Sequence, residues 1–232
     1  MTTATFVLVP GADGRAWYWH LVVPALRALG HDVVAVDLPT ADSAGLAEFA
    51  GAVVEAIGDR SGLVLVAQSL AGFHAPLVCE RIPVDLLVLL NAMVPAPGES
   101  AGDWWAATGH AQARAEHAAQ AGREPDAEFD LRTDFFHDVP PEVTDEALAA
   151  GGSAPPSALF AQPWPLRSWP DVPTRFLQSR DDRFFPVEFQ RRVVGERLGI
   201  TLEEMPGGHL VALSRPKELA ARLSAYAQTL GR

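Results

Sequence analysis

Cysteine is nearly absent from this chain of 232 residues, in which Cys79 is the single one. Because a disulfide needs two cysteines, no intrachain disulfide can form, and a metal site built from several cysteines is excluded. No apolar run approaches the ~20 residues that are needed to cross a bilayer. The first five residues also lack the basic region and the cleavage pattern of a signal peptide. We therefore expect a soluble cytoplasmic protein.

Positively charged residues are also few: the chain has 18 Lys and Arg against 29 Asp and Glu, and its net charge is −11. Such a field repels the phosphates of nucleic acids and anionic membranes, so we expect neither as a partner. Hydrophobic residues make up 48% and charged residues 20%. These fractions are typical of a globular chain, and the length fits one large α/β domain.

Short apolar runs recur along the first hundred residues, and each ends at a turn. They cover residues 6–9, 32–37, 63–67 and 86–90. Because the runs are apolar rather than alternating, they predict strands that are buried on both faces, and therefore a parallel sheet with helices on each side. Helical patterns lie between them, at about residues 17–29, 45–58 and 71–81, as parallel strands require.

The pattern stops between about residues 95 and 170, where helical patterns cover 101–121 and 142–150 and no strand candidate occurs. This stretch is too long for a plain loop in a compact domain. We predict a helical lid, residues 95–170, inserted into a core that is formed by residues 1–94 and 171–232. The strand and helix pattern then resumes, with strands at 174–177 and 200–205 and helices at 187–198 and 216–229.

Ser69 follows the third predicted strand and precedes a helical pattern, which is the position of a nucleophile elbow. In an elbow a sharp turn raises the serine hydroxyl above the sheet, and small residues on either side let strand and helix approach. The usual pattern is G-x-S-x-G, whereas Ala67 and Ala71 replace both glycines here and Gly72 follows. The alternative is a serine that caps a helix.

A nucleophilic serine needs a base, and the base needs an acid that orients it. His209 follows two glycines directly after a predicted strand, which lets the backbone present the ring over the sheet edge; the alternative is a histidine in a surface turn. Asp181 and Asp182 follow another strand, and only one of the two can reach the histidine. The chain order of serine, acid and histidine is similar to that of the α/β-hydrolases.

Acyl transfer also needs N–H groups that stabilise the negative charge on the former carbonyl oxygen. We predict that one is the N–H of Leu70, which follows the nucleophile at a helix start where backbone donors are free. The other is the N–H of Ala12, in the first strand–helix loop, which Gly11 allows to fold tightly. The alternative for this loop is a plain tight turn. A dinucleotide site is disfavoured, because Trp17 stands where that fingerprint needs glycine.

Several stretches together carry a resemblance to a known family: residues 9–19, 36–39, 68–72, 136–138, 182–190 and 208–216. Over essentially its full length the chain resembles the α/β-hydrolase superfamily, in particular the branch of plant methylesterases, hydroxynitrile lyases and bacterial esterase relatives. The resemblance implies a mostly parallel central sheet flanked by helices, a helical lid, no cofactor, and hydrolysis of carboxylic esters. It also implies that Asp182, six residues before Glu188, is the acid.

The chain departs from that family pattern at several positions. The family usually has histidine at the positions of Pro10 and Gln68, while the lyases of this branch resemble one another in a threonine at Gly11 and a lysine at Leu210. Without that cation to hold departing cyanide, hydrolysis is favoured. We predict a serine hydrolase that cleaves small to medium esters through an acyl-enzyme, with the catalytic residues Ser69, Asp182 and His209 and the oxyanion donors Ala12 and Leu70. The alternatives are a lyase, a C–C bond hydrolase, or a non-catalytic binder of small molecules.

Overall fold

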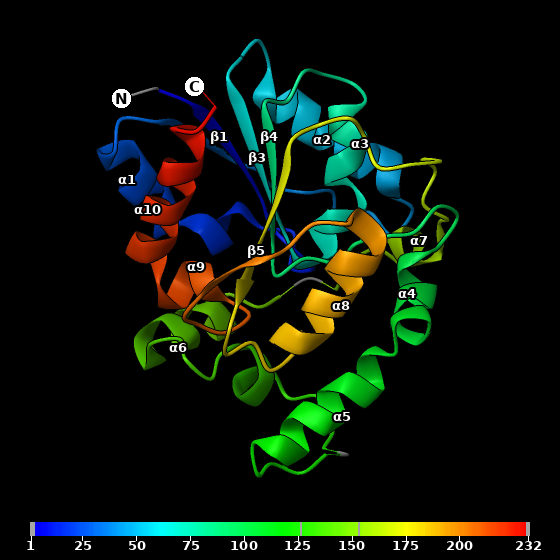
Figure 1. Cartoon of the computed structure of the whole chain (residues 1–232). Coiled ribbons are helices and arrows are strands. Elements are labelled where there is room, and N and C mark those ends of the chain that lie inside the picture. The colour runs from blue at the N-terminus through cyan, green and yellow to red at the C-terminus, as the bar shows by residue number, and fades with distance from the viewer. Residues whose placement is uncertain (1–2, 126, 153, 231–232) are drawn as a thin grey trace.

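A parallel sheet of six strands forms the centre of the molecule in the computed structural model, which describes residues 3–125, 127–152 and 154–230 (Figure 1). The strands are β1 (Thr5–Val9), β2 (Asp32–Ala35), β3 (Leu63–Gln68), β4 (Leu86–Leu90), β5 (Thr174–Ser179) and β6 (Glu203–Met205). Their order across the sheet is β2-β1-β3-β4-β5-β6, and every neighbouring pair is parallel. The predicted α/β fold with a parallel sheet is confirmed.

Two apolar layers cover the two faces of the sheet, which explains why the strands are apolar along their whole length. In β1, Val7 and Val9 point into the layer that α2 (Leu46–Ile57), α3 (Ala75–Cys79) and α8 (Val187–Leu198) cover. Phe6 and Leu8 point into the opposite layer, which is covered by α1 (Val22–Ala28) and α10 (Pro216–Ala227). Figure 1 shows α1 and α10 side by side on one face.

The segment between β4 and β5 holds the helices α4 (Ala101–Thr108), α5 (His110–Gln120), η3 (Leu131–Phe135), α6 (Pro141–Ala149) and α7 (Ser157–Ala161). Its described residues form no strand, apart from one isolated bridge between Ser100 and Pro163. In Figure 1, α5 and α6 lie at the end of the sheet toward which the β5 arrow points. We call residues 95–170 the lid segment.

Some boundaries differ from the sequence prediction. The predicted helix 101–121 is two helices, because Gly109 adopts a left-handed φ of 67° between α4 and α5. The predicted helix 71–81 is a 3-10 turn, η2 (Ser69–Phe73), followed by α3. The strand predicted over 200–205 begins only at Glu203. The predicted helix 17–29 is a 3-10 turn, η1 (Ala16–Trp19), followed by α1. Three short elements were not predicted: η3, α7 and α9 (Val211–Ser214).

Among the described helices, none has the length and apolarity that a membrane crossing requires.

Candidate active site

Ser69 lies at a sharp turn between the end of β3 and η2, at the centre of the sheet. Its φ is 53°, a left-handed conformation that is uncommon for residues other than glycine and costs on the order of 1–3 kcal/mol. Such strain is typical of a nucleophile elbow, in which the turn holds the serine above the sheet. Ser69 does not cap η2 through its side chain, since the residue before η2 is Gln68.

Two glycines allow other segments to approach this turn closely. A Cβ atom on Gly72 would lie 1.8 Å from the carbonyl oxygen of Met93, so only glycine fits there. A Cβ atom on Gly11 would lie 2.9 Å from Cβ of Ser69, which shows how closely the first strand–helix loop passes the serine. Ala67 and Ala71 are fully buried, and their methyl groups are accommodated without glycine.

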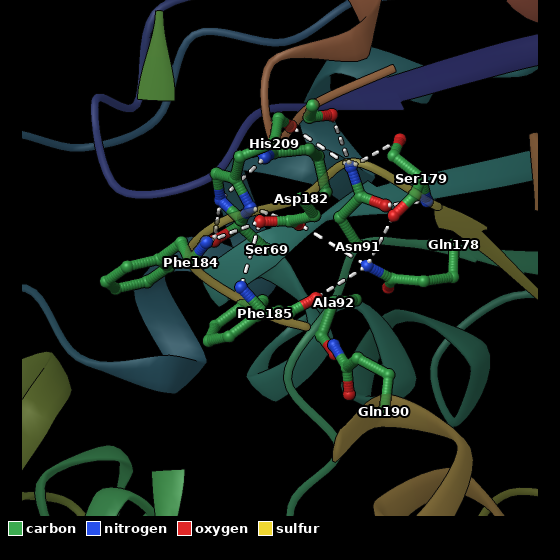
Figure 2. A network of polar contacts seen from close by, with 12 residues as sticks. Ser69, Asn91, Ala92, Gln178, Ser179, Asp182, Phe184, Phe185, Gln190 and His209 are labelled. Atoms are coloured by element: carbon green, nitrogen blue, oxygen red, sulfur yellow. Dashed lines mark hydrogen bonds and ion pairs between the residues drawn. The ribbon is translucent and has the colours of Figure 1, made fainter. Parts of the chain in front are cut away.

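Three side chains form a continuous polar chain at this turn, as Figure 2 shows. The distance between Oγ of Ser69 and Nε2 of His209 is 3.1 Å, and that between Nδ1 of His209 and Oδ2 of Asp182 is 2.8 Å. Because a carboxylate only accepts hydrogen bonds, Nδ1 of His209 carries the proton and Nε2 is free to accept one from Ser69. The structure therefore brings together the three residues that the sequence singled out.

Asp182 is fully buried and is held by the backbone that follows it. Its Oδ1 accepts hydrogen bonds of 2.8 Å from the N–H groups of both Phe184 and Phe185, while Oδ2 faces His209. Asp181 is exposed, and its carboxylate accepts the N–H of Gly207 instead. Of the two adjacent carboxylates, only Asp182 is oriented toward the histidine.

Two buried amides that the sequence prediction missed support the loops around this chain. Asn91, directly after β4, donates from Nδ2 to the carbonyl oxygens of Gly208 and His209. Gln178, in β5, donates from Nε2 to the carbonyl oxygen of Phe185 at 2.8 Å. Each is a polar residue at the carboxyl end of a strand, at the sheet edge where the site lies, and this position is the signal that could have identified them.

Gln68 contributes a further contact to the histidine. Its Nε2 lies 3.3 Å from Nε2 of His209, so the amide and the hydroxyl of Ser69 compete for one lone pair. The sequence marked Gln68 only as a departure from the family pattern.

The two predicted oxyanion donors lie close to the serine. Ala12 lines the same pocket as Ser69, and Leu70 follows Ser69 as the second residue of η2. Within the described part of the chain, neither N–H group is bonded to an acceptor. Leu70 is not one of the residues that line the pocket.

A pocket of about 490 Å³ opens above Ser69 and His209. Core loops contribute Trp17, Tyr18 and Leu210 to its wall, and the lid segment contributes Phe135 and Phe136. Desolvation by burial raises the pKa of the Tyr18 hydroxyl, which keeps that group neutral. The pocket is therefore mainly apolar. Its aromatic residues are Trp17 and Tyr18 from the core and two phenylalanines from the lid segment, and none of them is a lid tryptophan.

The lid tryptophans pack instead of lining the pocket. Trp104 and Trp164 are buried in the layer that α2, α3 and α8 cover, and their ring N–H groups donate to the carbonyl oxygens of Val94 and Phe73. Among the described residues, no group of three His, Cys, Asp or Glu side chains is arranged to hold a metal ion.

Comparison with known proteins identifies the family. A family model described as "Alpha/beta hydrolase family" matches residues 6–222. The chain is 29% identical to "Probable esterase PIR7A" of Oryza sativa over 92% of this chain and 93% of the relative. It is 24% identical to an "Alpha-hydroxynitrile lyase" of Arabidopsis thaliana over 96% of each chain.

A solved structure shows the same fold. A pyrethroid hydrolase from Sphingobium faniae superposes with a TM-score of 0.75, at 22% identity and 98% coverage of both chains. The family match, which spans nearly the whole sequence, decides the assignment: this chain belongs to the alpha/beta hydrolase family.

Proposed function

We propose that this protein is a serine hydrolase that cleaves small to medium carboxylic esters through an acyl-enzyme intermediate. The observation that carries the proposal is the polar chain from Ser69 through His209 to Asp182, which lies beneath an apolar pocket. Family membership and a relative named as a probable esterase support ester hydrolysis.

In the first half of the reaction, Oγ of Ser69 attacks the ester carbonyl carbon while Nε2 of His209 takes the hydroxyl proton. Asp182 holds the imidazole in the required tautomer and stabilises the imidazolium that forms. The N–H groups of Ala12 and Leu70 stabilise the negative charge on the former carbonyl oxygen. The C–O bond to the alcohol then breaks, and the alcohol leaves with the proton from His209.

In the second half, His209 takes a proton from a water molecule as the water oxygen attacks the acyl carbon. The bond to Ser69 breaks, the serine oxygen regains a proton from His209, and the carboxylic acid leaves. No step requires a metal or an organic cofactor. Acid, base and nucleophile all come from this chain.

The pocket favours neutral substrates of moderate size. Its volume of about 490 Å³ lies at the lower end of the range for small-molecule sites. The charged side chains of Arg15 and Asp13 at its wall neutralise each other in an ion pair of 2.8 Å. We propose a small ester as the partner, with no role for nucleic acid or membrane, and a cytoplasmic location.

Lyase chemistry is disfavoured by the residues at two pocket positions. In the lyases of the branch that this chain resembles, a lysine stands at the position of Leu210. Leu210 lines the pocket and supplies no cation there. The same lyases carry a threonine at the position of Gly11. A Cβ atom at this position would lie 2.3 Å from Oε1 of Gln68, so a threonine fits here only if the Gln68 side chain moves.

The test combines turnover with active-site labelling. We expect hydrolysis of p-nitrophenyl esters, with a preference among acyl lengths, and labelling of Ser69 by a fluorophosphonate probe, located by mass spectrometry. Ser69→Ala should abolish both. Ser100→Ala should retain both, because Ser100 is a buried serine that caps α4 by accepting the N–H of Asp103.

Two alternatives give different results, the lyase in an added assay with mandelonitrile. A binding protein would show neither turnover nor an adduct, and a lyase would release cyanide from mandelonitrile. Turnover that survives Ser69→Ala would show that the nucleophile has been wrongly assigned.

A further inference from the structure

We infer that Phe135, which the lid segment supplies, is a positioning residue for His209: its ring covers one face of the imidazole and stabilises the imidazolium that forms during ester cleavage. The inference rests on the proposed function and deepens it. It assigns to the lid segment a part in the proton transfer as well as in forming the pocket wall.

The geometry of the contact is that of a stacked pair. The ring centroids of Phe135 and His209 are 4.5 Å apart, and the two planes meet at 19°. The other phenylalanines around the imidazole lie at steep angles, 71° for Phe184 and 80° for Phe185. Among the described residues, Phe135 is therefore the one aromatic side chain that presents its face to the imidazole face.

The face of an aromatic ring carries partial negative charge, so it attracts a cation more strongly than the neutral group. When His209 takes the proton from Ser69, the ring of Phe135 is already stacked on it, and no reorganisation is needed. The contact is thus stronger in the charged state that the reaction passes through than in the resting state. This difference is what makes an interaction catalytically useful.

Phe135 is held in place by polar contacts of its neighbours in η3. Asp134 is buried, and its carboxylate pairs with Arg114 of α5 at 2.9 Å and accepts the N–H of Asp130 at 2.9 Å. In addition, Arg183 donates to the carbonyl oxygen of Thr133 at 2.9 Å. Because Arg183 directly follows Asp182, η3 is connected to the loop that carries the acid.

Several other titratable or charged groups surround His209. Asp182 contacts it directly, and His110 of α5 is close enough to interact with it electrostatically. On the lid side, His137 and Asp138 adjoin the loop of His209, where Asp138 accepts the N–H of Gly208. Desolvation by burial lowers the pKa of both His110 and His137, which leaves them neutral near pH 7. Replacing Phe135 leaves all of these groups in place.

The test is a pair of neighbouring substitutions, Phe135→Leu and Phe136→Leu. Both remove an aromatic wall of the pocket, but only Phe135 stacks on His209. For Phe135→Leu we expect kcat to fall roughly three- to thirtyfold. We also expect the acid limb of the pH–rate profile to move to lower pH by roughly 0.5 to 1.5 units, which is the same range of free energy, because the imidazolium has lost a stabilising contact. Phe136→Leu should change KM and leave the pH profile in place, and Phe135→Tyr, which keeps the ring face, should restore both kcat and the profile.

The inference is wrong if Phe135→Leu, folded by circular dichroism, changes KM alone and has the wild-type pH profile. A second measurement does not depend on activity: the ring current of Phe135 should shift the C–H proton resonances of the His209 imidazole upfield in the wild-type protein. Absence of that shift, or its persistence in Phe135→Leu, would overturn the stacking. A wild-type protein without esterase activity would instead refute the proposed function, so the two failures are distinguishable.

Discussion

Gly72 offers the sharpest test of how the turn at Ser69 is built. In Gly72→Ala, the new Cβ atom would lie 1.8 Å from the carbonyl oxygen of Met93, whereas ordinary contacts begin at 3.4 Å. The two backbones would have to separate by about 1.6 Å, the difference between these two distances. Met93 cannot move alone, because its N–H donates to the carbonyl oxygen of Ser69 at 2.9 Å.

The cost should therefore lie at or above the upper end of the range for overpacked sites, about 3 kcal/mol. That is a large fraction of the 5–15 kcal/mol by which domains are typically stable. We expect a correspondingly lower free energy of unfolding in urea, followed by tryptophan fluorescence. Ester turnover should also be lost, since Ser69 would be displaced together with Met93.

The matched control is Gly195→Ala, in the middle of α8, where a Cβ atom would meet no other atom within 4 Å. Alanine is favoured over glycine in a helix, so this variant should be more stable by about 0.5–1 kcal/mol. If Gly72→Ala is fully active and unfolds within about 1 kcal/mol of the wild type, the close approach at the elbow does not require glycine and the reasoning fails.

Two further predictions concern buried polar groups. Asp182→Asn should lose most turnover, by up to ~10⁴ as in the serine-protease example of this substitution, whereas Asp181→Asn should lose less than about tenfold. The reverse pattern in kcat would move the acid to Asp181. Burial lowers the pKa of His74 to about 3, so the neutral side chain supports the fold at pH 7. The unfolded state binds the proton first, and stability should fall as the pH drops from about 6.5 toward 3. Between pH 7 and pH 4, His74→Leu should lose about 3 kcal/mol less of its free energy of unfolding than the wild type does, as measured by urea unfolding. An equal loss in both proteins would contradict this reasoning.

The strands could be predicted from the sequence because burial on both faces leaves a local signature. Each of the runs at 6–9, 63–67 and 86–90 lies within an observed strand, since a parallel sheet covered on both sides admits few polar residues. Ends of elements were harder to predict. The break between α4 and α5 depends on the left-handed backbone of Gly109, and a lone glycine in a helical pattern is often tolerated.

The candidate site was predictable where it depends on chain order and missed where it depends on contacts between distant segments. Ser69 and His209 stand out because each follows a predicted strand in a small-residue context. Asn91 and Phe135 do not, because their partners lie more than seventy residues away in the sequence and nothing local indicates the contact. The roles assigned to these residues stay predictions until the substitutions are measured.

The two walls of the pocket come from different stretches of the chain. This separates the residues that determine which substrate fits from those that determine turnover. The groups that move protons stand on core loops, while a set of pocket positions belongs to the segment between β4 and β5: Leu131, Phe135, Phe136, Ala147, Leu148, Gly152 and Ala154. Variation confined to those positions would alter which ester fits without moving Ser69 or Asp182. Phe135 is the exception, because it belongs to the variable wall and also stacks on the base. In a library built on this scaffold, substrate range and turnover should therefore be separable at six of these positions and linked at the seventh.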